Sequence, residues 1–188
     1  MVGETLLRFL DVVSEHIKNL KSHLNLENVE EMIKLIDGSK AIFVIGAGRS
    51  GYIAKAFAMR LMHLGYAVYV VGETVTPRIT MDDTLIAISG SGETTSVVNI
   101  SKKAKDIGSK LVAITGNRNS SLAEMADVVV LIKAKIKKEK DEALSQLAPL
   151  GTMFELSTMT FLDALVAEIM MRKHLTESDL EARHAVLE

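Results

Sequence analysis

Five short runs rich in apolar residues divide the chain, and they constrain its fold more than any other feature. The runs are Ala41–Ile45, Ala67–Val71, Leu85–Ile88, Lys110–Asn117 and Asp127–Ile132. Apolar runs of this length are typical of strands that are buried on both faces of a sheet. We expect segments with helical spacing to separate the early strands. The alternation predicts an α/β fold with a doubly wound, five-stranded parallel sheet flanked by helices.

Two helices are predicted before the sheet. Apolar residues recur at helical spacing over Glu4–His23, and a shorter helix is expected over Leu26–Ile36. We expect these helices to form an N-terminal hairpin over about residues 1–38. Its apolar surface exceeds what a small sheet needs, which points to a partner subunit, although packing in the core explains the same stripe.

The remaining chain completes a single domain over residues 1–188. The sheet core is expected over about residues 40–132, with a short helix at Ser121–Met125 before the last strand. C-terminal helices over about residues 150–188 follow, and they are a long helix from Thr152 to about Lys173 and a short one from Glu177 to Arg183.

The third apolar run leads into a loop with two glycines and four hydroxyl side chains, Ser89–Thr95. Backbone N–H groups, hydroxyls and the positive end of the following helix together make an anion site, so the loop predicts a phosphate cradle. The alternative is an N-cap followed by a flexible turn. One cap needs one hydroxyl, however, and this loop has four.

The first apolar run leads into Gly46–Gly51, whose Gly-x-Gly-x-x-Gly pattern matches the dinucleotide-binding fingerprint. Glu73, at the end of the second strand, stands where an acidic residue would hold a ribose. Arg49 and Ser50 fit a phosphorylated small molecule equally well, and a dinucleotide fold has no need of the second polar loop at Ser89–Thr95. We therefore favour a phosphorylated small molecule.

Both loops are expected at one place. Ligands of a doubly wound sheet bind beyond the carboxyl ends of the strands, where the strand order reverses. With the order 2-1-3-4-5, the first and third strands flank that crevice. The two glycine loops would then lie side by side.

The composition excludes several classes of function. There are 22 Lys and Arg residues against 24 Asp and Glu, which gives no support to nucleic-acid binding. The chain has no cysteine, which excludes disulfides and Cys-based zinc sites. No apolar run approaches the roughly 20 residues that span a bilayer, and Met1–Asp11 lacks a signal-peptide pattern. We expect a cytoplasmic protein with no metal and no membrane partner.

Five motifs resemble those of the sugar isomerase (SIS) domain family. They are Gly46–Gly51, Arg60–Gly65, Gly72–Thr74, Ser89–Thr94 and Gly151–Glu155. The resemblance covers the chain from about Ile42 to His184. The Ser-Gly-Ser-Gly-Glu-Thr loop is specific to SIS domains, whereas Arg-Ser-Gly-Tyr and Gly-Glu-Thr point to the 6-phospho-3-hexuloisomerase branch.

The resemblance implies an enzyme that interconverts D-arabino-hex-3-ulose 6-phosphate and D-fructose 6-phosphate in the ribulose monophosphate pathway. The reaction would pass through an enediolate and need no cofactor. The resemblance also implies a homotetramer with active sites shared between chains. An isomerase of another phosphosugar is one alternative. A non-catalytic phosphosugar-sensing module is another, although such modules usually accompany a DNA-binding domain that is not recognised here.

The resemblance further implies the residues of the site. Glu155 is expected to be the catalytic base, and its alternative role is that of an acid placed to favour the helix dipole. His184 is expected to be a catalytic acid, against the alternative of a solvated terminal histidine. The residues expected to bind the phosphosugar lie in the two loops, and they are Gly48, Arg49, Ser50, Ser89, Gly90, Ser91, Gly92, Glu93 and Thr94.

The sequence leaves the roles of several other charged and polar residues undecided. Arg49 could instead form a surface salt bridge, and Glu73, Thr74 and Arg183 are weaker candidates for the site. The charged run Lys133–Glu142 reads as a solvated loop or as a lid that attracts phosphate.

Overall fold

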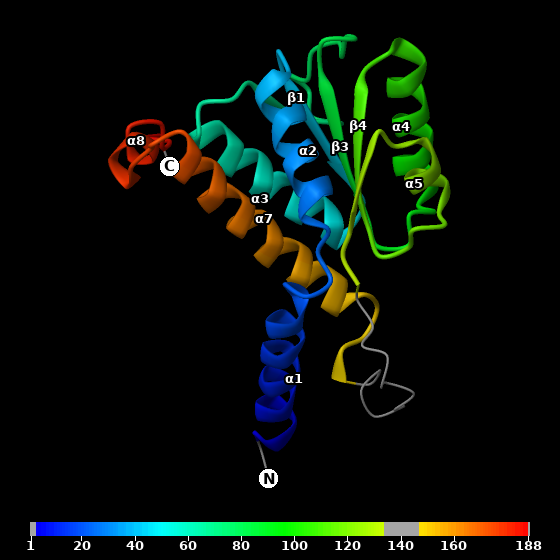
Figure 1. Ribbon diagram of the computed structural model, residues 1–188, viewed down its shortest axis with the longest axis vertical. Helices are drawn as coiled ribbons and strands as arrows, with labels where there is room; N and C mark the ends of the chain where they lie inside the picture. Colours follow the sequence, from blue (N-terminus) through cyan, green and yellow to red (C-terminus); the bar gives the residue numbers. More distant parts are fainter. Residues whose placement is uncertain (1–2, 134–146, 188) are drawn as a thin grey trace.

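The computed structural model describes residues 3–133 and 147–187. A five-stranded sheet lies between two layers of helices (Figure 1). Its strands are β1 (Ile42–Gly46), β2 (Val68–Val70), β3 (Thr84–Ser89), β4 (Lys110–Thr115) and β5 (Val128–Leu131). The order is β2-β1-β3-β4-β5 and every neighbouring pair is parallel, which confirms the predicted doubly wound sheet.

Each face of the sheet is covered by its own set of helices. On one face, alternate strand residues such as Ile86 and Ile88 join a core with α2 (Leu26–Gly38), α3 (Arg49–His63) and α7 (Thr152–Arg172). On the other face, the intervening residues contact α4 (Thr95–Ile107) and α5 (Ser121–Met125). All six residues of β3 are buried, as expected of a central strand covered on both sides.

Local signals set several helix ends. Asn25 caps α2 by accepting hydrogen bonds from the backbone N–H groups of Glu27 and Asn28. The short helix α8 (Glu177–Glu181) begins with a capping box between Thr176 and Asp179. Gly108 ends α4 in the left-handed conformation that glycine adopts without strain.

The connection from β2 to β3 differs from the expectation. Residues 71–83 contain no helix, so the prediction that helical segments separate all the early strands was wrong here. Pro77 interrupts the segment, and local hydrogen bonds hold it instead, including one from Thr76 Oγ1 to the carbonyl of Val70 at 2.6 Å. A hollow of about 520 Å³ remains between this segment and α4.

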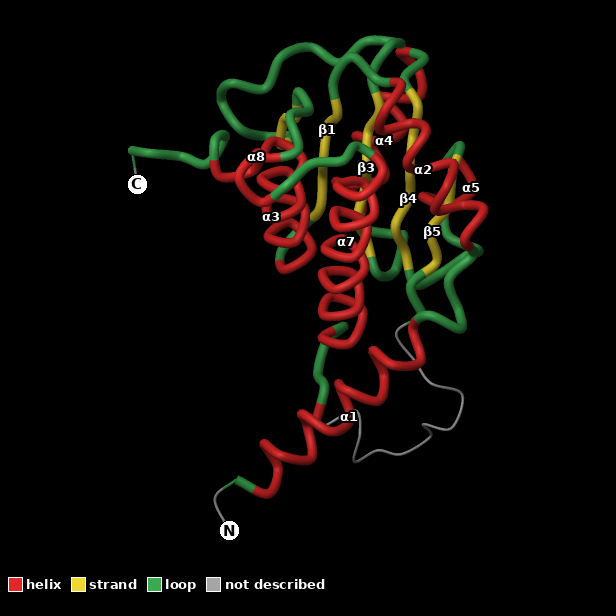
Figure 2. The backbone as a smooth tube through the Cα atoms, turned by 60° about the vertical axis from the view of Figure 1, so that its left-hand side comes forward, coloured by secondary structure: helices red, strands yellow, loops and turns green. Residues whose placement is uncertain are grey.

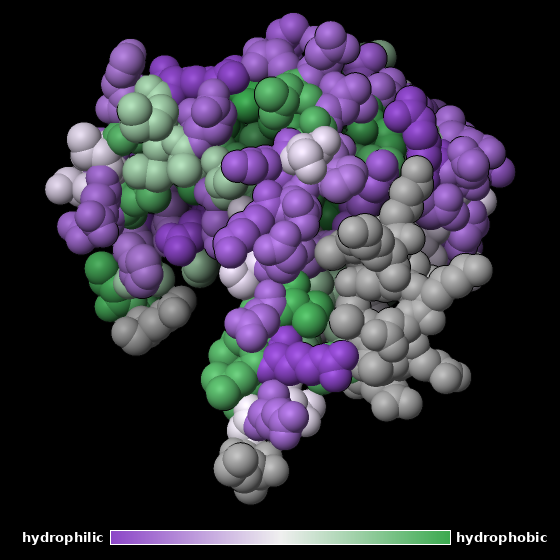
Figure 3. All heavy atoms as spheres, turned by 60° about the horizontal axis from the view of Figure 1, so that its bottom comes forward, coloured by the Kyte–Doolittle hydropathy of each residue, from purple (hydrophilic) through white to green (hydrophobic). Residues whose placement is uncertain are grey.

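The N-terminal helix α1 (Glu4–Leu20) projects from the body (Figures 1 and 2). The expected hairpin is not formed, because α2 continues away from the end of α1 rather than folding back along it (Figure 1). Leu6, Leu7 and Leu10 are 61%, 61% and 53% exposed. Figure 3 shows hydrophobic side chains along the projecting segment. An apolar helix face of this kind is typical of a contact surface.

Candidate active site

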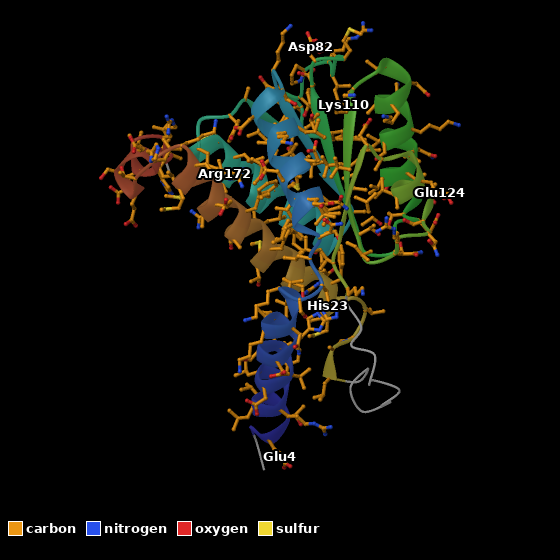
Figure 4. All side chains as sticks on the ribbon, viewed as in Figure 1. Glu4, His23, Asp82, Lys110, Glu124 and Arg172 are labelled. Carbon is orange, nitrogen blue, oxygen red and sulfur yellow. The ribbon has the colours of Figure 1, made fainter. Side chains whose placement is uncertain are left out.

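The two glycine loops lie together at the carboxyl edge of the sheet. β1 and β3 are hydrogen-bonded neighbours, with Gly46 opposite Ile88, so the loops that follow them start side by side. In Figure 4, Asp82 and Lys110 mark the opposite edge, where β3 and β4 begin. The switch point of the strand order is therefore where the sequence predicted it.

The loop after β1 depends on two glycines. A Cβ on Gly46 would lie 2.5 Å from the carbonyl oxygen of Ser50, so only glycine allows so tight a turn. Gly48 has φ +56° and precedes α3, and no side chain caps that helix. Arg49 and Ser50 form its first turn, as the sequence predicted. Their backbone amides lie at the positive end of the helix.

The loop after β3 is held by its own hydroxyls. Ser89 is 2% exposed. Its Oγ accepts a hydrogen bond from the N–H of Gly92 at 3.1 Å and lies 3.0 Å from Thr94 Oγ1. Ser91 Oγ accepts from the N–H of Glu93 at 3.1 Å. These bonds curl the loop at the start of α4.

The start of α4 bears on the choice between a phosphate cradle and a simple cap. The cap residue Thr94 makes no side-chain hydrogen bond to the helix. The first backbone hydrogen bond of α4 runs from the N–H of Val98 to the carbonyl of Thr94, at 2.9 Å. The hydroxyls of the loop therefore do not act as the N-cap. The preceding amides of the first turn remain available to an anion.

Glu93 is hydrogen-bonded to a residue outside its own loop. Its carboxylate accepts hydrogen bonds from the N–H and the Oγ of Ser121, each at 2.8 Å. The hydrogen bonds from the Ser121 backbone and side chain lower the pKa of Glu93. Sequence reasoning grouped Glu93 with the phosphosugar ligands and did not consider Ser121. The signal for Ser121 was its place at the helix that follows β4, the strand beside β3.

The first turn of α7 closes the site. Phe154 is 3% exposed, and its ring lies so close to Gly90 that a Cβ there would be 3.0 Å from Phe154 Cδ1. The next residue, Glu155, forms an ion pair with Arg49 Nε. The Glu155 side chain is 11% exposed and that of Arg49 is 63% exposed. The structure thus brings Glu155 to Arg49 beside the first glycine loop and its neighbour Phe154 to Gly90 of the second.

A hollow opens beside this ion pair, between α3 and α7. Its volume is about 260 Å³. Its lining combines the paired charges with apolar side chains, and the residues are Arg49, Tyr52, Ile53, Glu155, Leu156 and Met159. Tyr52, which belongs to the Arg-Ser-Gly-Tyr motif, is 74% exposed.

His184 lies elsewhere in the same chain. Its ring stacks on that of His63, with 5.1 Å between centroids and 25° between planes. His63 ends α3 and Arg49 begins it, so the two ends are about 21 Å apart. The structure therefore does not bring His184 to Glu155 of its own chain. Arg183 anchors this terminal segment by donating from Nη1 to the carbonyl of His63 at 3.1 Å.

The weaker candidates fall outside this group. Glu73 pairs with Lys55 at 2.6 Å, and Thr74 is exposed in the segment after β2. Most of the charged run Lys133–Glu142 lies outside the described residues. Within residues 3–133 and 147–187, no cluster of acidic or histidine side chains could hold a metal ion. In the same part of the chain, no helix has the length and apolar character to cross a membrane.

Comparisons with known proteins identify the relatives of this chain. The profile of the SIS domain matches residues 35–167. An uncharacterised protein of Archaeoglobus fulgidus is 81% identical over 97% of this chain and 100% of its own length. The 3-hexulose-6-phosphate isomerase of Methanocaldococcus jannaschii is 44% identical over 96% of this chain and 98% of its own. A crystal structure from Methanococcus jannaschii, described as inferring that same function, has a TM-score of 0.85 and 44% identity, covering 95% of this chain and 98% of its own.

Proposed function

The chain belongs to the SIS domain family, and from this premise we propose that it interconverts D-arabino-hex-3-ulose 6-phosphate and D-fructose 6-phosphate. The relative of that name from Methanocaldococcus jannaschii, at 44% identity, supports this substrate class. The observation that carries the proposal is the start of α7, where Glu155 pairs with Arg49 and the adjacent Phe154 packs against Gly90. In this proposal the enzyme acts in the cytoplasm, in the ribulose monophosphate pathway.

The phosphate would bind at the loop after β3. The free amides at the start of α4 and the hydroxyls of Ser89, Ser91 and Thr94 offer donors to a dianion, and Ser50 adds one from the other loop. Gly48 leaves open space where a side chain would stand, so the backbone there could approach the ligand closely, whereas Gly90 and Gly92 make room for Phe154 and Ser120 and so shape the loop. This anchor holds the phosphate end while the carbonyl end of the sugar extends toward α7.

Glu155 would then move a proton between adjacent carbons. Its carboxylate removes the proton from C2 of the hex-3-ulose, and the electron pair of that bond forms the 2,3-enediolate. Returning the proton to C3, with transfer of a proton between the two oxygens, gives the 2-ketose. No oxidant or reductant is needed, because the reaction only moves the carbonyl group from C3 to C2.

Arg49 would change partners during this cycle. In the free protein its guanidinium neutralises the carboxylate of Glu155. The Arg49 side chain is largely exposed, so it can swing toward the oxygens of a bound phosphosugar at little cost in burial. That movement would leave the carboxylate free to accept the proton and put a positive charge beside the enediolate oxygen.

His184 would serve the site of another subunit in a homotetramer. Within its own chain it lies near the far end of α3 from Arg49. The exposed leucines of α1 offer a surface through which chains could associate. We expect the pair Leu6→Glu and Leu10→Glu to dissociate the assembly in sedimentation analysis and to reduce turnover, whereas Arg8→Glu on the same helix should do neither. An assembly unchanged by the paired substitution would exclude α1 as the contact surface.

The central test is the variant Glu155→Gln. We expect it to bind fructose 6-phosphate normally and to lose about 10²- to 10⁴-fold in kcat, the range for removal of a general base. Turnover of fructose 6-phosphate can be followed by coupling to an aldolase and trapping the released formaldehyde. Glu168→Gln, on an exposed part of α7, is the matched control. A near-normal kcat for Glu155→Gln would assign the base to another residue.

A further inference from the structure

Glu93 is the one charged residue of the Ser89–Thr94 loop, and its direction is fixed from outside that loop. Both of its hydrogen-bond donors belong to Ser121, at the start of α5 and 28 positions along the chain. The Glu93 residue itself is exposed, so burial does not force the carboxylate into this orientation. The two hydrogen bonds from Ser121 hold it in this orientation.

The same neighbouring segment supports the loop at two further points. The N–H of Gly116 donates to the carbonyl of Gly90 at 3.0 Å, and the N–H of Leu122 donates to the carbonyl of Gly92 at 3.1 Å. Both carbonyl oxygens are thereby turned toward the β4 side of the loop. The loop is thus buttressed along its length by residues 116–122, and Glu93 provides the side-chain part of this support.

Electrostatics give this arrangement a consequence for binding. A carboxylate directed into a phosphate cradle would repel a dianion and compete for the same N–H donors. Ser121 holds the carboxylate of Glu93 at the start of α5, where both of its oxygens accept hydrogen bonds. The loop can then present only donors to the ligand.

We propose that Glu93 is a positioning residue, which sets the phosphate cradle through Ser121 and does not touch the phosphosugar. The inference rests on the proposed function for the identity of the ligand. Removing either partner should weaken binding of the phosphate while leaving the chemistry at Glu155 largely intact. The expected signature is therefore a change in KM rather than in kcat.

The test combines steady-state kinetics with calorimetric binding of fructose 6-phosphate and of inorganic phosphate. Loss of a charge-assisted contact should raise KM and Kd about tenfold in Glu93→Ala, with kcat changed less than about threefold. Ser121→Ala keeps the backbone donor and should raise both by at least about threefold. Glu93→Gln should recover most of the lost affinity, because its amide can accept from the Ser121 N–H and donate to the Ser121 Oγ.

Two comparisons separate positioning from direct contact. The double variant Glu93→Ala with Ser121→Ala should be no worse than Glu93→Ala alone, because both changes break one interaction. Glu124→Ala, an exposed acid on α5 (Figure 4), should leave KM and Kd unchanged. If Ser121→Ala keeps normal affinity while both Glu93 variants lose it, Glu93 contacts the ligand and the inference is wrong.

Three further results would count against the role of Glu93 or against the proposed function. Variants with lower melting temperatures and unchanged Kd would show that Glu93 only stabilises the fold, which overturns the inference. A wild-type protein that binds neither fructose 6-phosphate nor phosphate would overturn it as well. A wild-type protein that binds fructose 6-phosphate without isomerising it would refute the proposed function alone, and the Kd comparison would still test Glu93.

Discussion

Replacing Gly92 by alanine tests the packing of the cradle most directly. Gly92 is buried and has φ +69°, a conformation that costs a residue with a side chain roughly 1–2 kcal/mol. The added Cβ would overlap Oγ and Cβ of Ser120 and come within 3.0 Å of Thr115 Oγ1. Overpacking of this kind costs roughly 1–3 kcal/mol more. We therefore expect Gly92→Ala to lower the free energy of unfolding by about 2–5 kcal/mol.

Ser120 has little freedom to give way. Its Oγ accepts from the N–H of Ala123 at 3.3 Å and donates to the carbonyl of Asn117 at 2.8 Å, so it caps α5 and ties the preceding turn. Moving Ser120 would break both bonds, whereas moving Gly92 would break its N–H bond to Ser89 Oγ and shift the loop in which we propose that the phosphate binds. The KM for the phosphosugar should therefore rise along with the loss of stability.

Gly108 provides the matched control. It lies at the other end of α4 with φ +95°, and the nearest atom to an added Cβ is Met81 Cβ at 3.5 Å, an ordinary contact. Gly108→Ala should thus cost only the backbone strain, about 1–2 kcal/mol in urea unfolding, with KM unchanged. Equal losses of stability in the two variants, with normal KM in Gly92→Ala, would refute the reasoning.

Two further predictions concern pH. Burial raises the pKa of Asp127, but hydrogen bonds, led by that from Lys105, outweigh it and hold the pKa below its usual range. Asp127→Asn should therefore lower the unfolding free energy at pH 7, and in urea titrations the difference should fade as the pH falls below about 4; a constant difference would contradict this. Burial, with the charge of His184, lowers the pKa of His63, so wild-type stability should fall from pH 7.5 to 5.5 as unfolding takes up a proton. His63→Gln should show a smaller fall, and an identical pH profile would exclude His63 as the cause.

The sheet and the two loops could be predicted from sequence because their signals are local. A buried strand must be apolar over its own length, and Gly46 is required by atoms four residues away. Strand limits in the structure differ from the predicted limits by at most two residues, and Ser121–Met125 was predicted with the observed bounds. The parallel arrangement followed from the alternation of strands and helical segments, whereas the order 2-1-3-4-5 was assumed and is confirmed by the structure.

Prediction from the sequence reached its limit where parts of the chain that are distant in sequence set a residue's environment. Helical spacing in Glu4–Leu20 predicts an apolar face but not what covers it, so the hairpin was wrong while the helix was right. The segment 71–83 has the length of a helix, yet Pro77 and its local hydrogen bonds favour an irregular path. The orientation of Glu93 depends on Ser121, which only the pairing of β3 with β4 brings near.

The placement of Glu155 follows from the residue before it. Successive residues of a helix point about 100° apart, so a first turn that buries Phe154 against Gly90 must direct Glu155 to a neighbouring face. That face meets α3, where Arg49 pairs with the carboxylate. A side chain at position 90 would push the Phe154 ring outward and rotate the first turn of α7 with it. The position of the carboxylate therefore depends on the absence of a side chain at Gly90, in the loop that follows another strand.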